Sequence, residues 1–163
     1  MRLTSKGRYG VSAMVDINNN GKDGKPVTLA TISERQFISL SYLEQLFRLL
    51  RAGGLVRSIR GPGGGYLLAH PANEITIADV IQAVNEPIRT TMCENAVRGC
   101  HRGKRCDTHQ LWDAMGKHIY RFLDVVTIEM VCQKEVDLNN LELKSVENII
   151  PEVVMEQRIA KVS

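Results

Sequence analysis

Apolar residues recur at helical spacing along this chain, and clusters of glycine and asparagine separate the apolar stretches. Residues 5–17 carry an imperfect apolar stripe that predicts a first helix, and the turn-forming residues 18–24 end it. Thr28 is well suited to an N-cap, which predicts a second helix through about Gln36. The amino-terminal part of the chain is therefore predicted to be mostly helical.

A third helix is predicted to follow almost at once. Ser39 or Ser41 can cap it, and Ser41 with Glu44 matches a capping-box pattern. Gly53 and Gly54 end this helix. The side chains predicted to be buried on it are Leu43, Leu46, Phe47 and Leu50.

A β-hairpin is predicted after the third helix. Residues 55–60 alternate apolar and polar side chains, residues 61–65 read Gly-Pro-Gly-Gly-Gly, and residues 66–69 form a returning strand. Two helices joined by a short connection and followed by a hairpin are typical of a winged helix-turn-helix, whose second helix enters the DNA major groove. The predicted fold class is therefore mainly α with a small β-hairpin wing.

Three further helices are predicted beyond the hairpin. Thr76 and Asp79 form a capping box for one that Pro87 ends, and Thr127 caps a short one. Between them a long amphipathic helix runs from about Asp107 to Asp124. Its apolar stripe consists of Leu111, Met115, Ile119, Phe122 and Val126, broadened by Trp112 and Tyr120. Because helix-turn-helix proteins usually bind DNA as symmetric dimers, we expect this helix to pair with its copy.

These elements predict a division of the chain into four parts. They are a winged helix-turn-helix domain (1–86), a loop rich in cysteine and histidine (87–109), a dimerisation helix region (110–134) and a carboxy-terminal tail (135–163). The last turn of the tail is predicted to be helical around 151–159, but it carries no recognisable chemistry.

Composition and charge narrow the possible partners. The apolar content is 44%, yet no run approaches the roughly 20 residues that span a membrane. The start lacks the apolar stretch of a signal peptide, so a cytoplasmic protein without a membrane partner is expected. Residues 1–70 hold ten Lys or Arg against four Asp or Glu, and residues 71–163 hold eleven against fourteen. The amino-terminal half is thus the candidate for binding an anionic polymer.

The most distinctive motif of the chain is a cluster of metal-binding residue types. Cys93, Cys100, Cys106 and His109 have the spacing Cys-x6-Cys-x5-Cys-x2-His. In the cytosol such clusters bind metal or act in redox chemistry more often than they form disulfides. A closed Cys3His site suits structural zinc, and an iron–sulfur cluster also fits. His101 is the competing imidazole. The residues alone leave zinc and iron–sulfur about equal, and free thiols in so polar a loop are the weakest interpretation.

Taken together, these stretches resemble the IscR family of iron–sulfur cluster regulators. The resemblance covers roughly residues 1–134. It is carried by residues 1–9, 32–35, 38–47, 54–56 and 60–68, together with the Cys, Cys, Cys, His order. The chain departs from the family pattern in a first cysteine gap that is one residue longer, in Phe37 where relatives tend to have a turn glycine, and in the asparagine run that ends the first helix.

The resemblance implies a homodimeric transcription regulator that is not an enzyme. It implies one [2Fe–2S] cluster per subunit, held by Cys93, Cys100, Cys106 and His109, with the iron–sulfur cluster assembly machinery as cluster donor. The target promoters would govern genes for iron–sulfur cluster assembly. Cys132, in an apolar helix, is interpreted as a core residue.

Double-stranded DNA operator sites are the expected partner of the amino-terminal half. The candidate contacts on the third helix and its turn are Ser39, Ser41, Tyr42, Glu44, Gln45 and Arg48, and those on the wing are Arg57, Arg60, Gly63 and Gly64. Consecutive glycines suit a backbone that approaches another surface closely. A rival interpretation, a redox enzyme that uses the same cluster, leaves the glycine-rich wing unexplained.

Overall fold

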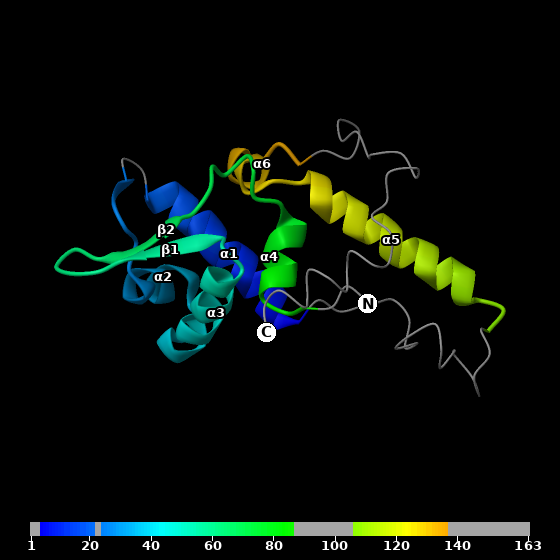
Figure 1. The fold of residues 1–163 in the computed structure, drawn as a ribbon, viewed down its shortest axis with the longest axis horizontal. Coiled ribbons are helices and arrows are strands. Elements are labelled where there is room, and N and C mark those ends of the chain that lie inside the picture. The colour runs from blue at the N-terminus through cyan, green and yellow to red at the C-terminus, as the bar shows by residue number, and fades with distance from the viewer. Residues whose placement is uncertain (1–3, 22–23, 87–105, 137–163) are drawn as a thin grey trace.

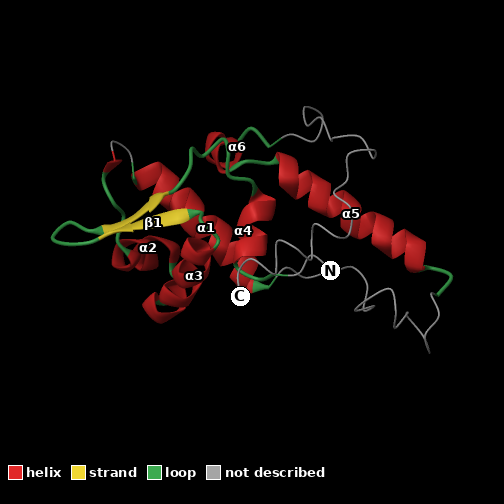
Figure 2. Cartoon of the chain, in the orientation of Figure 1, coloured by secondary structure: helices red, strands yellow, loops and turns green. Residues whose placement is uncertain are grey.

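The computed structural model describes residues 4–21, 24–86 and 106–136. The helices are α1 (Ser5–Asn20), α2 (Leu29–Gln36), α3 (Leu40–Ala52), α4 (Ile77–Ala83), α5 (His109–Val125) and α6 (Ile128–Gln133), and the strands are β1 (Val56–Ile59) and β2 (Gly65–Leu68) (Figure 1). Helices make up most of this part of the chain, with one antiparallel hairpin (Figure 2). The predicted fold class is confirmed.

The predicted helix-turn-helix is formed by α2 and α3, which pack against each other. The Thr28 side chain accepts a hydrogen bond from the Thr31 amide at 3.2 Å, as expected of an N-cap. The N-cap of α3 is Ser39, whose side chain makes no capping bond. The predicted capping box of Ser41 with Glu44 is therefore wrong, because Ser41 already lies inside the helix, where its hydroxyl is exposed.

Two predicted helix ends also need correction. Helix α1 continues through the asparagine run to Asn20, and the Gly21 amide closes it on the Ile17 carbonyl at 2.7 Å. The Asn20 side chain donates to the Asp16 carbonyl oxygen at 2.9 Å, so this residue is bonded within the helix rather than forming a turn. The second correction concerns α4, which was predicted to end at Pro87. It ends earlier, at Ala83, and Asn85 follows with a φ of 54°.

The wing is an antiparallel pair that is tied to the segment before α2. In the hairpin Val56 is opposite Leu68, and Ile59 is opposite Gly65. Val27 forms a third, isolated bridge with Tyr66, through amide–carbonyl bonds of 2.9 and 2.8 Å. The wing is therefore fixed to the entry of the helix-turn-helix as well as to its exit.

One core joins the helices of the winged helix-turn-helix domain (described residues 4–21 and 24–86), which is named the reading domain. Phe47 of α3 is fully buried, and its ring meets that of Tyr66 with centroids 4.7 Å apart. Val126 and Ile128, which follow α5, belong to the same core, and α6 packs on α1. Thr76 and Thr127, the caps of α4 and α6, form an antiparallel bridge that fixes the end of α5 to this body. No helix in the described ranges has the length and apolarity that a membrane crossing requires.

A buried carboxylate connects α1 to α2. Asp16 is 3% exposed and accepts hydrogen bonds from Arg35 at 2.5 and 3.0 Å and from Gln36 at 2.9 Å. Burial by itself would raise the pKa of Asp16. The hydrogen bonds from Arg35, Gln36 and Asn20 and the charge of Arg35 outweigh burial and hold that pKa below its ordinary value.

The replacement Asp16→Asn is expected to lower the free energy of unfolding at neutral pH by about 1–3 kcal/mol, because Arg35 and Gln36 lose a charged acceptor. A depressed carboxyl pKa stabilises the fold above the ordinary value of 3.8, and this stabilisation disappears as the pH falls toward the lower value of the folded state. As the pH falls below 3.8, the Asp16→Asn variant should therefore lose less stability than the wild-type protein does. Urea unfolding across the acid range measures the difference, and parallel curves would contradict this account.

Candidate nucleic-acid interface

Helix α3 separates its buried and exposed residues cleanly. Its buried face consists of Leu43, Leu46, Phe47 and Leu50, as predicted. Of the predicted DNA contacts on this helix and its turn, the exposed ones are Ser39, Ser41, Glu44, Gln45 and Arg48. They bring hydroxyl, carboxylate, amide and guanidinium groups onto one side of a helix, and these groups can bond to base edges and phosphates.

Tyr42 differs from the other predicted contacts because it is only half-exposed. Its ring meets the ring of Tyr9 in α1 edge to face, with centroids 5.8 Å apart and planes at 89°. Such a pair contributes about 0.5–1.5 kcal/mol beyond simple burial. Tyr42 therefore holds the first turn of α3 against α1, a role that its sequence position did not indicate.

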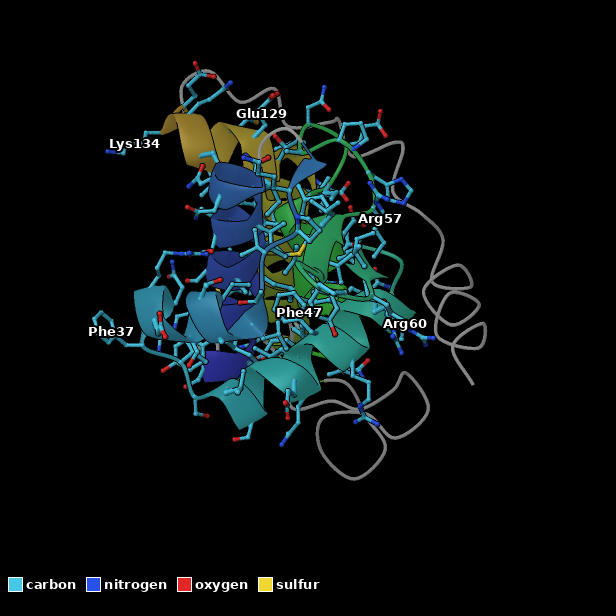
Figure 3. All side chains as sticks on the ribbon, turned by 90° about the vertical axis from the view of Figure 1, so that its left-hand side faces the viewer. Phe37, Phe47, Arg57, Arg60, Glu129 and Lys134 are labelled. Carbon is cyan, nitrogen blue, oxygen red and sulfur yellow. The ribbon has the colours of Figure 1, made fainter. Side chains whose placement is uncertain are left out.

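The arginines of the wing are exposed. Arg57 lies on β1 and Arg60 follows it, and both project from the side of the molecule opposite to Phe37 (Figure 3). Within the described ranges the ion pairs join Arg35 to Asp16 and Lys117 to Asp113, so no acidic side chain there neutralises Arg48, Arg57 or Arg60. Unpaired guanidinium groups suit phosphates and narrow minor grooves.

The wing glycines are needed for different reasons. Gly61 and Gly63 have φ values of 100° and 75°, and a Cβ at Gly63 would meet nothing within 4 Å. A Cβ at Gly64 would lie 2.4 Å from the Ile59 carbonyl oxygen, and one at Gly65 would lie 2.5 Å from that of Val27. Close packing within the chain therefore explains Gly64 and Gly65, whereas Gly61 and Gly63 are explained by their positive φ and have open space where a side chain would begin.

Phe37, in the turn before α3, combines two unfavourable features. Its φ is 54°, in the left-handed region that disfavours bulky side chains, and it is 93% exposed. The sequence showed an unusual residue in this turn, but the positive φ and the exposure emerged only from the structure. Figure 3 shows the ring projecting away from the body.

Relieving this strain is expected to stabilise the protein. Phe37→Gly should raise the free energy of unfolding by about 1 kcal/mol, because a left-handed conformation costs an L-residue roughly 1–2 kcal/mol and costs glycine little. Phe37→Ala keeps the Cβ and serves as the control, with little gain expected. Chemical denaturation compares the two variants, and equal stabilities would show that Phe37 is not strained.

Only part of the predicted metal set lies in the described ranges. Cys106 is exposed, with its sulfur 3.5 Å from the Thr108 hydroxyl. The His109 amide donates to the Cys106 carbonyl at 3.0 Å, so the two residues are one turn apart where α5 begins. Cys93, Cys100 and the competing His101 lie outside the described residues. Within the described ranges no group of three His, Cys, Asp or Glu side chains is placed to hold a metal ion.

Cys132 occupies a different environment from Cys106. It is half-buried between α6 and α1, and its sulfur accepts a hydrogen bond from the Asn18 side chain at 3.2 Å. It packs against the core, as the sequence predicted. The partner Asn18 was not predicted, because the asparagine run was interpreted as a turn.

Comparison with known proteins agrees with this geometry. The family model Rrf2, described as an iron-dependent transcriptional regulator, matches residues 3–134. The chain is 56% identical over 137 residues to the HTH-type transcriptional regulator IscR of Pectobacterium carotovorum subsp. carotovorum, covering 83% of this chain and 82% of that protein.

Two solved structures are also similar. One is T. potens IscR, with a TM-score of 0.67 at 33% identity, covering 87% of this chain and 93% of that chain. The other is CymR (YrzC), the global cysteine regulator of B. subtilis, with a TM-score of 0.69 at 30% identity, covering 82% and 98%. With its winged helix-turn-helix and these matches, the chain belongs to the Rrf2 family of iron-dependent transcriptional regulators and is a DNA-binding regulator rather than an enzyme.

Proposed function

We propose that this regulator acts as a homodimer that senses iron–sulfur status through one [2Fe–2S] cluster per subunit and controls genes such as those for iron–sulfur cluster assembly. The observation that carries the proposal is the position of Cys106 and His109. They offer an exposed thiol and an imidazole within one turn, at the beginning of the long helix that follows the reading domain. The 56% identical relative named IscR supports the same assignment.

The proposed ligands are Cys93, Cys100, Cys106 and His109. The donor set fits, because thiolates hold iron–sulfur clusters and a histidine in place of a cysteine raises their potential. When bound, the cluster supplies a link between four side chains that responds to iron supply and oxidation. The proposed donor of the cluster is the iron–sulfur cluster assembly machinery.

The homodimer is proposed to form through α5. No residue of this helix is fully buried, and Leu111, Trp112 and Met115 are 61%, 42% and 37% exposed. Phe122 and Leu123, near its other end, pack against the core instead. Figure 1 shows α5 reaching away from the reading domain. A second copy of the helix would cover the exposed apolar residues.

In the proposed complex, α3 enters the major groove of operator DNA and the wing contacts the flanking backbone and minor groove. Gln45 suits adenine, and Glu44 accepts from the N4 amino group of cytosine. Glu44 would also reject other base pairs, because its carboxylate would then be desolvated without a donor. Arg60 would enter the minor groove and Arg57 would bind phosphate. Ser39, Ser41, Tyr42 and Arg48 would complete the contacts on α3, and Gly63 and Gly64 those on the wing.

Regulation would depend on whether the segment 87–109, which carries the proposed ligands, holds a cluster. The four ligand side chains are held together in one state and released in the other, and each state favours a different dimer geometry on DNA. Promoter choice would then follow iron–sulfur status.

The test compares Cys106→Ala with Cys132→Ala, purified without air. Cys106→Ala is expected to lose iron, sulfide and visible absorbance and to bind promoters as cluster-free protein does, because one of four ligands is missing. Cys132→Ala should keep all of these, since its sulfur contacts Asn18 inside the fold. Iron and sulfide analysis, a visible spectrum and promoter binding provide the measurements. If Cys106→Ala retained the cluster, or lost it without any change in promoter binding, the proposal would be overturned.

The alternative function is a winged-helix regulator with a structural Cys3His zinc site. The same exposed Cys106 and neighbouring His109 favour it, because this donor pair also suits zinc. Colourless wild-type protein that contains zinc and no iron after air-free purification would establish this alternative.

A further inference from the structure

We infer that Glu86 is a positioning residue for the DNA-reading helix α3, to which it is connected through the first turns of α1. The inference rests on the proposed function, in which α3 reads base edges. Within the described ranges the hydrogen bonds to the Glu86 carboxylate come from Thr4 and not from a proposed DNA-binding residue. Its influence would pass through Thr4, Tyr9 and Tyr42, which are joined by the contacts described next.

The carboxylate of Glu86 holds the start of α1. This residue is 8% exposed, and one carboxylate oxygen accepts the Thr4 amide hydrogen at 3.0 Å while the other accepts the Thr4 hydroxyl. A buried carboxylate is costly unless it is hydrogen-bonded, so this pairing specifies where the first turn of α1 lies. Thr4 is also the N-cap of α1, with its side chain accepting from the Lys6 amide at 3.2 Å.

Two glycines allow the segment after α4 to approach α1 closely. A Cβ at Gly7 would lie 3.4 Å from Cγ of Glu86, and one at Gly10 would lie 3.3 Å from a methyl group of Val84. Glycine inside a helix costs roughly 0.5–1 kcal/mol relative to alanine. The close approach of residues 84–86 provides a reason for both glycines and makes α1 sensitive to the position of Glu86.

Helix α1 also contacts α3, through an aromatic pair. Tyr9 lies five residues after Thr4, about 7.5 Å along a rigid helix, and its ring meets that of Tyr42 in the first turn of α3. A shift of the Thr4 turn would therefore move Tyr9 and release Tyr42. Residues 39–45, which carry most of the proposed base contacts, would lose their fixed position.

The experiment measures how strongly the protein discriminates between two DNA sequences. Wild-type protein selects a duplex from a randomised pool, and each variant is then titrated with that duplex and with a shuffled duplex of the same composition. Glu86→Ala is expected to weaken binding to the selected duplex by roughly 2- to 10-fold, which corresponds to the loss of the interaction between two aromatic rings. Binding to the shuffled duplex should be unchanged. Glu86→Gln, which keeps one acceptor for Thr4, should recover part of the loss. Glu74→Ala, at an exposed glutamate, is the control.

A double-mutant cycle separates positioning from general destabilisation. Tyr9→Leu should cause the same selective loss, and Glu86→Ala combined with Tyr9→Leu should lose little more, because both act on Tyr42 along one path. If Glu86→Ala does not fold, Thr4→Val takes its place; it removes the hydroxyl bond to Glu86 together with the cap bond from the Lys6 amide, and keeps the bond from the Thr4 amide. Unchanged discrimination, or single losses that multiply in the double variant, would overturn the inference. A wild-type protein that selects no sequence would instead overturn the DNA-reading role itself.

Discussion

Replacing Phe47 by alanine is expected to lower the free energy of unfolding by about 3–5 kcal/mol. Phe47 is completely buried at the centre of the molecule (Figure 3). Its ring contacts the ring of Tyr66 in the wing. Alanine would leave a cavity between α3 and the hairpin and remove an aromatic pair. Because a domain of this size is typically stable by only about 5–15 kcal/mol, the variant would lose a large share of its stability.

Thermal and urea unfolding measure this loss, and two variants provide controls. Phe47→Leu keeps most of the volume and should cost considerably less. Arg51→Ala, on an exposed position of the same helix, should change stability little. A Phe47→Ala protein as stable as wild type would mean that α3 and the wing do not share one core.

Replacing Leu111 by glutamate is expected to separate the proposed dimer into monomers. Leu111 is 61% exposed in the single chain, and the proposed pairing of α5 would bury it. Burial of a leucine is worth about 1.5–3 kcal/mol, and a symmetric interface contains two copies. The dissociation constant of the dimer should therefore rise by roughly 100-fold or more, and operator binding should weaken because two linked half-sites are no longer held together.

The neighbouring residue offers a matched control for this substitution. Gln110→Glu introduces the same side chain one residue earlier, on an exposed position away from the apolar stripe, and should leave the dimer intact. Light scattering across a concentration series measures the oligomeric state. Wild-type protein that remains monomeric at every concentration, or a Leu111→Glu protein that dimerises normally, would contradict pairing through α5.

Local chemistry along the chain was sufficient to predict most elements of the fold. Thr28, Thr76 and Thr127 cap their helices as predicted, because a hydroxyl that accepts an amide hydrogen three residues later needs no distant partner. The buried face of α3 followed from helical periodicity in the same way. The candidate DNA contacts on α3 followed from the complementary face, and the proposed metal ligands from their spacing together with the resemblance to the IscR family, although both sets of roles stay predictions.

Distant contacts decided the rest. The sequence by itself determined where the helices and the hairpin lie, which residues face the core, and which residues carry candidate chemistry. Only the tertiary structure revealed that Gly65 accommodates the Val27 carbonyl, that Arg35 and Gln36 surround Asp16, and that Glu86 holds Thr4 while Tyr9 holds Tyr42. The hydrogen-bonded pairs among these partners are separated by 19 to 82 residues along the chain, and local propensity carries no information about which distant residues will meet. That choice depends on how the helices pack, because packing allows only certain side chains to come within bonding distance.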